Sequence, residues 1–351
     1  MNNKLILELL RVGVINPYRK RLTIGYFGSH ARFAREMLSF CSLEYSKYID
    51  MTAGGLGMLY YYLINGGKAI VANDLNYYSY VFGKAIFNGH GVMISPWDID
   101  ELFRQIEPMS GKFSIDFFKD MKSEVSGWID GAIHYAQRTE NYMFLASLMK
   151  YILMEFTWHG LNFTPKTSSG TLVKDITTHD VMVAVGKNII RYSFHAMAMR
   201  GCSAYMSWNC ANNFVKEYDG FKNAFVLVDP AWPWKKEKMV NPYIFLCETF
   251  PSYFYNGLMP KGTIPWTNHN LDVILADLTL WVTTAMEKGA GRFVVNTQDT
   301  NFPSSDVLTQ FFHDTFGVFH KVAGPSAWNV RKDSDTHTSK LRQFIYTIDR
   351  K

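Results

Sequence analysis

Cysteine is scarce in this chain of 351 residues, and the spacing of the few cysteines excludes two kinds of site. Cys41, Cys202, Cys210 and Cys247 are too far apart for the Cys-x-x-Cys pairs of zinc and redox sites. They are also too few for the disulfide framework of a small secreted protein, so we expect reduced thiols. The histidines have no partner at metal-ligand spacing, and we therefore expect no metal site.

Long apolar runs are absent as well. No stretch approaches the roughly 18 residues that a membrane-spanning helix needs. The N-terminal segment interrupts its short apolar run with Glu8 and Arg11, where a signal peptide would continue. Internal repeats and low-complexity tracts are missing too. We therefore expect a soluble cytoplasmic protein that binds no membrane.

Charge of one sign is not in large excess, whereas apolar residues are abundant. Lys and Arg number 36 against 31 for Asp and Glu, and the net charge of +5 permits contact with an anionic polymer without requiring it. Hydrophobic residues make up 48% of the chain, with 26 Phe, 20 Tyr and 9 Trp, which excludes a disordered chain. The length suits two domains, or one elaborated α/β domain with an inserted lobe.

The segment 48–72 predicts a β-strand, a glycine turn, a helix and a second strand. The turn is Gly54-Gly55-Leu56-Gly57, and Asp74 stands at the carboxyl end of the second strand, about 20 residues later. Such glycines let a ligand approach the backbone, and an acid at that place can accept hydrogen bonds from ribose hydroxyls, which favours an adenosine-containing cofactor. The spacing does not identify the cofactor, because neither G-x-G-x-x-G nor G-K-[ST] occurs. A simple strand-to-helix turn is the alternative interpretation.

The remaining periodicity divides the chain into three parts. Residues 93–220 are mostly helical, with helices expected over 128–150 and 180–199 and a loop at 164–171. Strands and helices then alternate, with strands at 224–228, 292–295, 318–322 and 343–348 and helices at 271–288 and 305–316. We therefore predict a discontinuous catalytic domain of residues 1–92 and 221–351, with a helical lobe of residues 93–220 inserted between its parts.

The loop after the strand at 224–228 is chemically specific. Asp229-Pro230-Ala231-Trp232 places a carboxylate, a peptide carbonyl fixed by proline and a flat aromatic surface within four residues. This set suits an exocyclic amino group on a planar base, because Asp229 and the Pro230 carbonyl can bind its hydrogens while Trp232 stacks on the ring. The alternative is a structural turn with tryptophans in the core, which we favour for Trp234.

Six segments, in chain order, resemble motifs of one known family. They are Tyr26-Phe27-Gly28-Ser29-His30 with Arg32 and Phe33, Asp50-Met51-Thr52-Ala53-Gly54-Gly55-Leu56, Asn73-Asp74-Leu75-Asn76, Trp158-His159-Gly160-Leu161, Asp229-Pro230-Ala231-Trp232, and Phe293-Val294-Val295-Asn296 through Asp299. The second is similar to acid-Pro-Phe-Ala-Gly-Gly-Gly, the third to Asn-Asp-Ile-Asn and the fifth to Asp-Pro-Pro-Tyr. With these segments in this order, the chain resembles the Dam-like family of adenine-N6 DNA methyltransferases, which use S-adenosylmethionine.

The resemblance implies an α/β fold: a Rossmann-like methyltransferase sheet flanked by helices, with an inserted, mainly helical recognition lobe. It implies S-adenosylmethionine as cofactor and site-specific methylation of adenine N6 in duplex DNA, with the target base flipped out of the stack. The implied catalytic residues are Asp229, Pro230 and Trp232. The implied cofactor-binding residues are Tyr26, Gly28, His30, Asp50, Thr52, Ala53, Gly54, Gly55, Asp74, Leu75 and Asp229.

Basic residues are the candidates for holding the DNA backbone. The cluster that we favour is Lys235, Lys236 and Lys238, and further candidates are Lys187, Arg191 and Arg200. For any one of the residues in the helical lobe, a solvated helix face is the more common explanation.

The chain departs from the family pattern at positions that bear on its chemistry. His30 replaces a lysine, Thr52 replaces an aromatic residue, and Ala231-Trp232 replaces Pro-Tyr. These departures keep alternatives open: a methyltransferase acting on a different amino-base, or a catalytically silent nucleic-acid-binding protein with the same fold. A nicotinamide-dependent oxidoreductase would leave Asp229-Pro230-Ala231-Trp232 unexplained.

Overall fold

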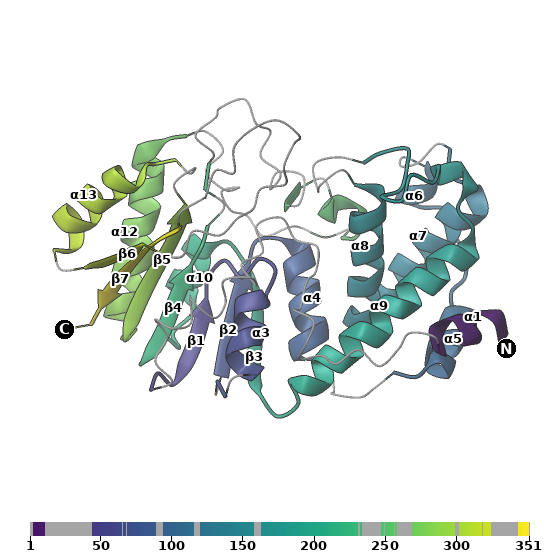
Figure 1. Ribbon diagram of the computed structural model, residues 1–351, viewed down its shortest axis with the longest axis horizontal. Coiled ribbons are helices and arrows are strands. Elements are labelled where there is room, and N and C mark those ends of the chain that lie inside the picture. The colour runs from purple at the N-terminus through teal and green to yellow at the C-terminus, as the bar shows by residue number, and fades with distance from the viewer. Residues whose placement is uncertain are drawn as a thin grey trace.

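A seven-stranded sheet organises the protein. The computed structural model describes residues 3–10, 44–64, 66–67, 69–88, 94–115, 120–157, 163–230, 232–233, 247–248, 250–255, 257, 269–298, 302–317, 319–323 and 343–350. The strands are β1 (Lys47–Asp50), β2 (Ala69–Asp74), β3 (Ser203–Trp208), β4 (Ala224–Val228), β5 (Arg292–Gln298), β6 (His320–Ala323) and β7 (Gln343–Asp349). Their spatial order is β3-β2-β1-β4-β5-β7-β6, which Figure 1 shows from one side.

The sheet is parallel except for one strand. β1 pairs in parallel with β2 and β4, and the parallel pairing continues to β3 on one side and β5 on the other. Only β7 runs antiparallel, between β5 and β6. The predicted α/β class is therefore confirmed, and the order 3-2-1-4-5 is compatible with a Rossmann-like sheet.

Both faces of the sheet are covered by apolar side chains, which explains the continuous hydrophobic runs in the central strands. Alternate residues of β4 enter different cores: Phe225 and Leu227 enter one, and Val226 and Val228 the other. Helices α3 (Gly57–Ile64) and α4 (Tyr77–Phe87) pack in the first core. The second core takes side chains from α10 (Ala211–Glu217), α12 (Leu271–Glu287) and α13 (Ser305–Phe316).

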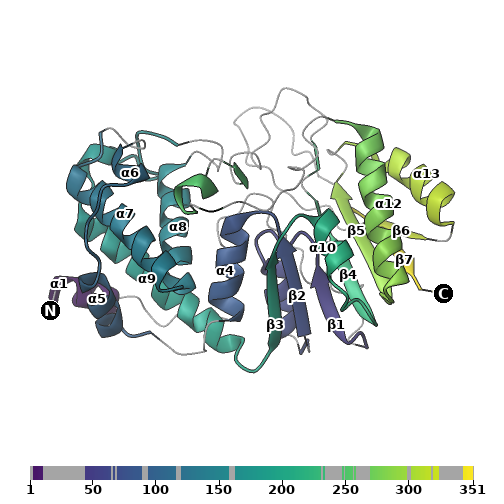
Figure 2. The ribbon, with the colours of Figure 1, turned by 180° about the vertical axis from the view of Figure 1, so that it is seen from behind.

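The middle of the chain is helical, as predicted. Its elements are α5 (Pro96–Arg104), α6 (Lys112–Ile115), α7 (Ser123–Arg138), α8 (Tyr142–Phe156), the 3₁₀ turn η2 (Val173–Asp175) and α9 (Thr178–Ala198). The N-terminal α1 (Asn3–Leu10) packs against α5 and α9, far from the sheet (Figure 2). The 3₁₀ turn η4 (Pro251–Tyr253) lies further along the chain.

The single helix expected over 128–150 is wrong, because the chain breaks between α7 and α8. Glu140 takes φ +51°, outside the helical region, and the Asn141 side chain accepts a hydrogen bond from the Phe144 backbone N–H. An Asn in this position caps the second helix and ends the continuity of the first. By contrast, the helix predicted at 180–199 is confirmed by α9, which begins with a capping box of Thr177 and Asp180.

The predicted lobe boundary at residue 220 is also wrong. β3 and α10 lie within residues 93–220 but belong to the sheet and to its second core. In addition, α8 and α9 pack on α4, so the middle helices share one apolar core with α3 and α4.

The later elements agree closely with expectation. The strand at 224–228 and the helix at 305–316 coincide with β4 and α13, and α12 covers the helix predicted at 271–288. Cys202, Cys210 and Cys247 are free thiols among the described residues. Across the same residues, the structure contains no helix with both the length and the apolarity to cross a bilayer.

Candidate functional site

The strand order places the two unusual loops side by side. The order reverses between β1 and β4, and ligands of open parallel sheets bind beyond the carboxyl ends of the strands at such a switch point. Asp50, the last residue of β1, lies in register with Leu227 of β4. The glycine loop and Asp229 therefore leave the same edge of the sheet at adjacent places.

Hydrogen bonds join these two loops directly. The backbone N–H of Asp229 donates to Thr52 Oγ1 over 2.8 Å, and the backbone N–H of Thr52 donates to Asp50 Oδ1 over 3.2 Å. Asp50 is buried, whereas Thr52 and Asp229 are half-buried. A hydroxyl at position 52 thus holds the backbone of the second loop, a role for which an aromatic side chain has no atom.

A second set of hydrogen bonds ties the glycine loop to the end of β2. The backbone N–H of Gly54 donates to Asp74 Oδ2 over 2.6 Å, and that of Asn76 donates to Asp74 Oδ1 over 2.7 Å. The Ala53 N–H donates to the Asn73 carbonyl over 2.9 Å. Gly54 has φ +48°, a conformation that glycine adopts at little cost. The glycine loop and the end of β2 are therefore joined through Gly54, Ala53 and Asp74.

Asp74 has an unusual electrostatic environment. Its side chain is 8% exposed, and burial raises the pKa of its carboxyl to about 6 although the backbone N–H groups of Asn76, Gly54 and Leu75 counteract this shift. The donors around it therefore compensate the negative charge only in part. A carboxylate can accept about four hydrogen bonds, so Asp74 keeps capacity for donors from a ligand.

Leu56 adopts a backbone conformation that suits glycine. It has φ +57° and is fully buried, and its N–H donates to the Ala53 carbonyl over 2.9 Å. A residue with a β-carbon in this region costs on the order of 1–3 kcal/mol and is retained only where its surroundings enforce it. The loop geometry is therefore imposed by packing and by the hydrogen bonds at Ala53 and Gly54.

The neighbouring end of β3 completes this edge of the sheet. Asp74 lies in register with Trp208, whose Nε1 donates to the Leu75 carbonyl over 2.9 Å. The Asn73 side chain donates to the carbonyls of Met51 and Asn209, over 3.1 and 3.0 Å, and so links the ends of three strands. Sequence reasoning missed β3 and Trp208, because a half-exposed edge strand lacks the continuous apolar run that revealed β4.

The loop after β4 differs from expectation at Trp232. Its side chain is 4% exposed and belongs to the second core, and its Nε1 donates to the Asn296 carbonyl over 2.7 Å. The Trp232 backbone N–H donates to the Pro230 carbonyl over 2.7 Å. Trp232 is therefore placed as a core residue and offers no face for stacking, so we drop the predicted stacking role. A core position is the structural alternative for a tryptophan in this loop.

The basic residues of α9 fall in different surroundings. Lys187 lies near Glu8 of α1, whose lowered pKa reflects a hydrogen bond with His179 and the nearby charges of His179, Lys4 and Lys187. Arg191 is exposed and lies near Lys150 of α8, whose pKa falls to about 8 because of burial and the Arg191 charge.

Arg200 lies near the amino-terminal ends of the strands, opposite to the candidate site. It precedes β3, and Ser203 at the start of β3 pairs with Ala69 at the start of β2. The candidate site follows the other ends of these strands, roughly 20 Å away at about 3.3 Å per residue. Arg200 is therefore not brought together with Asp74 and Asp229, because its position in sequence says nothing about the direction in which β3 runs.

Several predicted positions lie outside the described residues. They are Tyr26, Gly28, His30, the segment Trp158–Leu161, Ala231, Trp234, Lys235, Lys236, Lys238 and Asp299. Within the described part of the chain, no group of three or more His, Cys, Asp and Glu side chains is arranged to hold a metal ion.

The chain was compared with protein-family models and with curated proteins. No family model matches the chain, and a search of curated proteins finds no match.

Proposed function

We propose that the protein is an S-adenosylmethionine-dependent methyltransferase that transfers a methyl group to adenine N6 in DNA. The observation that carries the proposal is the pair of hydrogen bonds at the switch point. Gly54 is bonded to Asp74, and Thr52 is bonded to Asp229, so three strand ends form one site. Ligand binding at this edge is the general property of open parallel sheets.

The residues present suit an adenosine-containing cofactor. Asp74 is a carboxyl group whose pKa is raised by burial, and ribose hydroxyls would donate further hydrogen bonds to it. Gly54 is half-buried and has no side chain, so a ligand can approach its backbone closely, while Gly55 beside it is buried. Half-buried Leu75 stands beside Asp74. When bound, S-adenosylmethionine would supply an electrophilic methyl group to this site.

Asp229 and Pro230 account for the transfer on the acceptor side. The exocyclic amine of adenine is a weak nucleophile, because its lone pair is delocalised into the ring. A carboxylate and a carbonyl that accept its hydrogens favour the positive charge that develops as nitrogen attacks. The Pro230 carbonyl already accepts one hydrogen bond from the Trp232 N–H, and a carbonyl oxygen has a second lone pair for the amine.

The conformation of Leu56 supports the resemblance within the glycine loop. The third glycine of the family's Gly-Gly-Gly loop corresponds to Leu56. Its φ of +57° is the left-handed conformation that glycine favours. The substitution thus changes the residue but not the backbone path that a glycine would take.

A binding experiment followed by an activity experiment tests the proposal. S-adenosylmethionine is titrated into the protein in a calorimeter, and NAD is titrated in parallel. Transfer of tritium from labelled S-adenosylmethionine to DNA of varied sequence is then measured. We expect saturable binding of S-adenosylmethionine, no binding of NAD, and label that appears as N6-methyladenine. Absence of both binding and label contradicts the proposal, and label in cytosine identifies a different amino-base as the substrate.

One observation favours a second candidate function, that of a catalytically silent nucleic-acid-binding protein. The burial of Trp232 removes the stacking surface that the transfer reaction would use near Asp229. The same experiment separates the two candidates, since the silent protein binds DNA but incorporates no label.

A further inference from the structure

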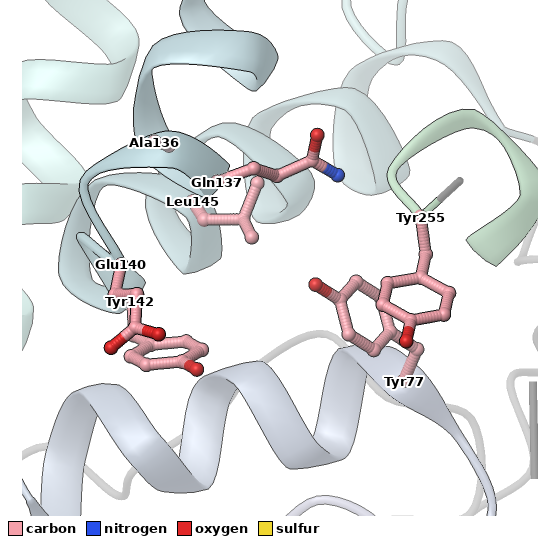
Figure 3. Close-up of a pocket in the computed structure, with 7 residues that line it drawn as sticks. All are labelled: Tyr77, Ala136, Gln137, Glu140, Tyr142, Leu145 and Tyr255. Atoms are coloured by element: carbon pink, nitrogen blue, oxygen red, sulfur yellow. The ribbon is translucent and has the colours of Figure 1, made fainter. Parts of the chain in front are cut away.

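A cavity of about 260 Å³ lies at the start of α4, three residues beyond Asp74, and contains none of the residues assigned above. Its aromatic and polar walls are formed by Tyr77, Gln137, Tyr142 and Tyr255, with Glu140 at the rim. Figure 3 shows Tyr77 and Tyr255 on one side of the space and Glu140 and Tyr142 on the other.

The walls of this cavity are held in place before any ligand arrives. The Gln137 side chain donates a hydrogen bond to the Phe254 carbonyl, which fixes the 250–255 segment against α7. The Trp208 ring supports two of the tyrosines, with centroid distances of 4.8 Å to Tyr77 and 4.7 Å to Tyr255. Little ordering cost therefore remains for binding, which favours affinity in a small pocket.

The chemistry of the walls selects a flat ring that carries hydrogen-bond donors. Three tyrosines from separate segments of the chain offer aromatic surfaces, and the only charged group among the described lining residues is the Glu140 carboxylate. Stacking on aromatic side chains binds any nucleobase, and Glu accepts hydrogen bonds from exocyclic amino groups. Phosphate finds no cation among these residues, so the base and not its phosphate would enter.

We propose that this cavity binds one unstacked, amino-bearing nucleobase of a nucleic-acid strand, at a position other than the methylated base. The ring stacks among Tyr77, Tyr142 and Tyr255, and its amino group donates to Glu140. Adenine and cytosine are therefore bound in preference to thymine, which has no exocyclic amino group. Binding of a nucleobase in this cavity does not depend on methyl transfer. The proposal rests on the proposed function only in taking the bound strand to be the DNA that is methylated.

Fluorescent single strands test the proposal without S-adenosylmethionine. Strands of about 12 nucleotides contain one 2-aminopurine, whose fluorescence falls when it stacks on an aromatic ring. Tyr142→Ala and Tyr255→Ala should each weaken binding about fivefold or more and restore the fluorescence. Tyr142→Phe, which keeps the ring, should stay within about twofold of the unmodified protein. Glu140→Gln should reduce the preference for adenine over thymine strands.

A matched control and a folding check accompany these variants. Trp97→Ala removes a half-exposed aromatic side chain (52% exposed) from α5, a helix that contributes nothing to the cavity, and should leave binding unchanged. Thermal melts followed by circular dichroism identify any variant that fails to fold. Tyr142 lies in α8 and Tyr255 in a separate segment, so if one alanine variant fails to fold, the other still tests the proposal.

Three results would overturn the proposal. The first is unchanged binding and quenching in folded Tyr142→Ala and Tyr255→Ala. The second is displacement of the quenched strand by S-adenosylhomocysteine, which would assign the cavity to the adenine of the cofactor. The third is displacement by choline but not by adenosine monophosphate, which would make the cavity a site for organic cations. Because strand binding is measured without S-adenosylmethionine, the result tests the nucleobase cavity independently of whether the protein transfers methyl groups.

Discussion

The two loops at the switch point are built differently. On the side of β1 and β2, the Gly54 N–H donates to the Asp74 carboxylate, the Thr52 N–H donates to the Asp50 carboxylate, and Asp74 keeps unused acceptor capacity. On the side of β4, Trp232 turns into the core and its backbone bonds to Pro230. The first loop is held by hydrogen bonds between backbone N–H groups and carboxylates, whereas the second is held by the core beneath it. Asp229 lies between them and is bonded to the first.

The largest expected effect is at Asp229. Asp229→Ala should reduce methyl transfer on the order of a thousandfold, because it removes the acceptor that stabilises charge on the attacking amine. S-adenosylmethionine binding, measured by calorimetry, should change less, since the bond to Thr52 uses the backbone of residue 229. Full activity in the variant would refute the assigned role of the carboxylate.

Trp232 distinguishes a core residue from a stacking residue. Trp232→Ala should lower the free energy of unfolding by about 3–5 kcal/mol, because it opens a cavity in the second core and removes the hydrogen bond to Asn296. Urea unfolding measures this change, and Trp232→Phe should cost less because it keeps most of the apolar volume. Unaltered stability combined with lost activity would instead support stacking on a base.

Asp74 should give the first loop a characteristic pH dependence. Its folded pKa, about 6, lies above the ordinary Asp value of 3.8, so its contribution to stability is fully present below pH 3.8 and is lost as pH rises through 6. The pKa shift is about two units, and each unit corresponds to about 1.4 kcal/mol, so the loss of stability amounts to roughly 3 kcal/mol. The difference in unfolding free energy between the unmodified protein and Asp74→Asn, measured from pH 3.5 to 7, should therefore fall by this amount.

The unfolding free energy of Asp74→Asn is subtracted from that of the unmodified protein because another buried group changes stability with pH in the opposite direction. Burial and the charge of Lys150 lower the pKa of His195 from 6.5 to about 4, so His195 contributes stability above pH 6.5 that is lost as pH falls through 4. This contribution is common to both proteins and cancels in the difference. A difference that stays flat with pH would show that Asp74 is not the under-compensated carboxylate that we describe.

The smallest expected effect is at Thr52, which connects the two loops. Thr52→Val keeps the shape and removes the acceptor for the Asp229 N–H, which should cost about 1–3 kcal/mol of unfolding free energy. Thr52→Ser keeps the hydroxyl and serves as the matched control. Methyl transfer by Thr52→Val should decrease more than its binding of S-adenosylmethionine, and the reverse order would place Thr52 on the cofactor side alone.

Local patterns predicted those parts of the fold that neighbours in sequence decide. The run Ala224–Val228 and the glycine loop before β2 were visible because buried strands and tight turns have distinct compositions. β3 was missed, because its half-exposed residues match no single period. The break at Glu140 was missed as well, since an Asn cap can occur inside an amphipathic stretch without disturbing its apolar spacing.

The candidate site divides in the same way. Asp74 and Gly54 could be paired from the sequence, because the glycine-to-acid spacing of a βαβ unit places them together. The bond between Thr52 and Asp229 could not, since it joins residues 177 positions apart. It depends on the register of β1 with β4, and no local pattern specifies that register.

By itself, the sequence determined that the chain alternates strands and helices, that glycines and an acid follow the first two strands, and that Asp229 follows a buried strand. These features are encoded in neighbouring residues, which set backbone preferences and turn positions directly. Tertiary structure decided that Asp229 lies against the glycine loop, that Trp232 belongs to the core, and that Arg200 lies at the far edge. Those outcomes depend on strand order and on burial, which arise only when distant segments compete for the same core.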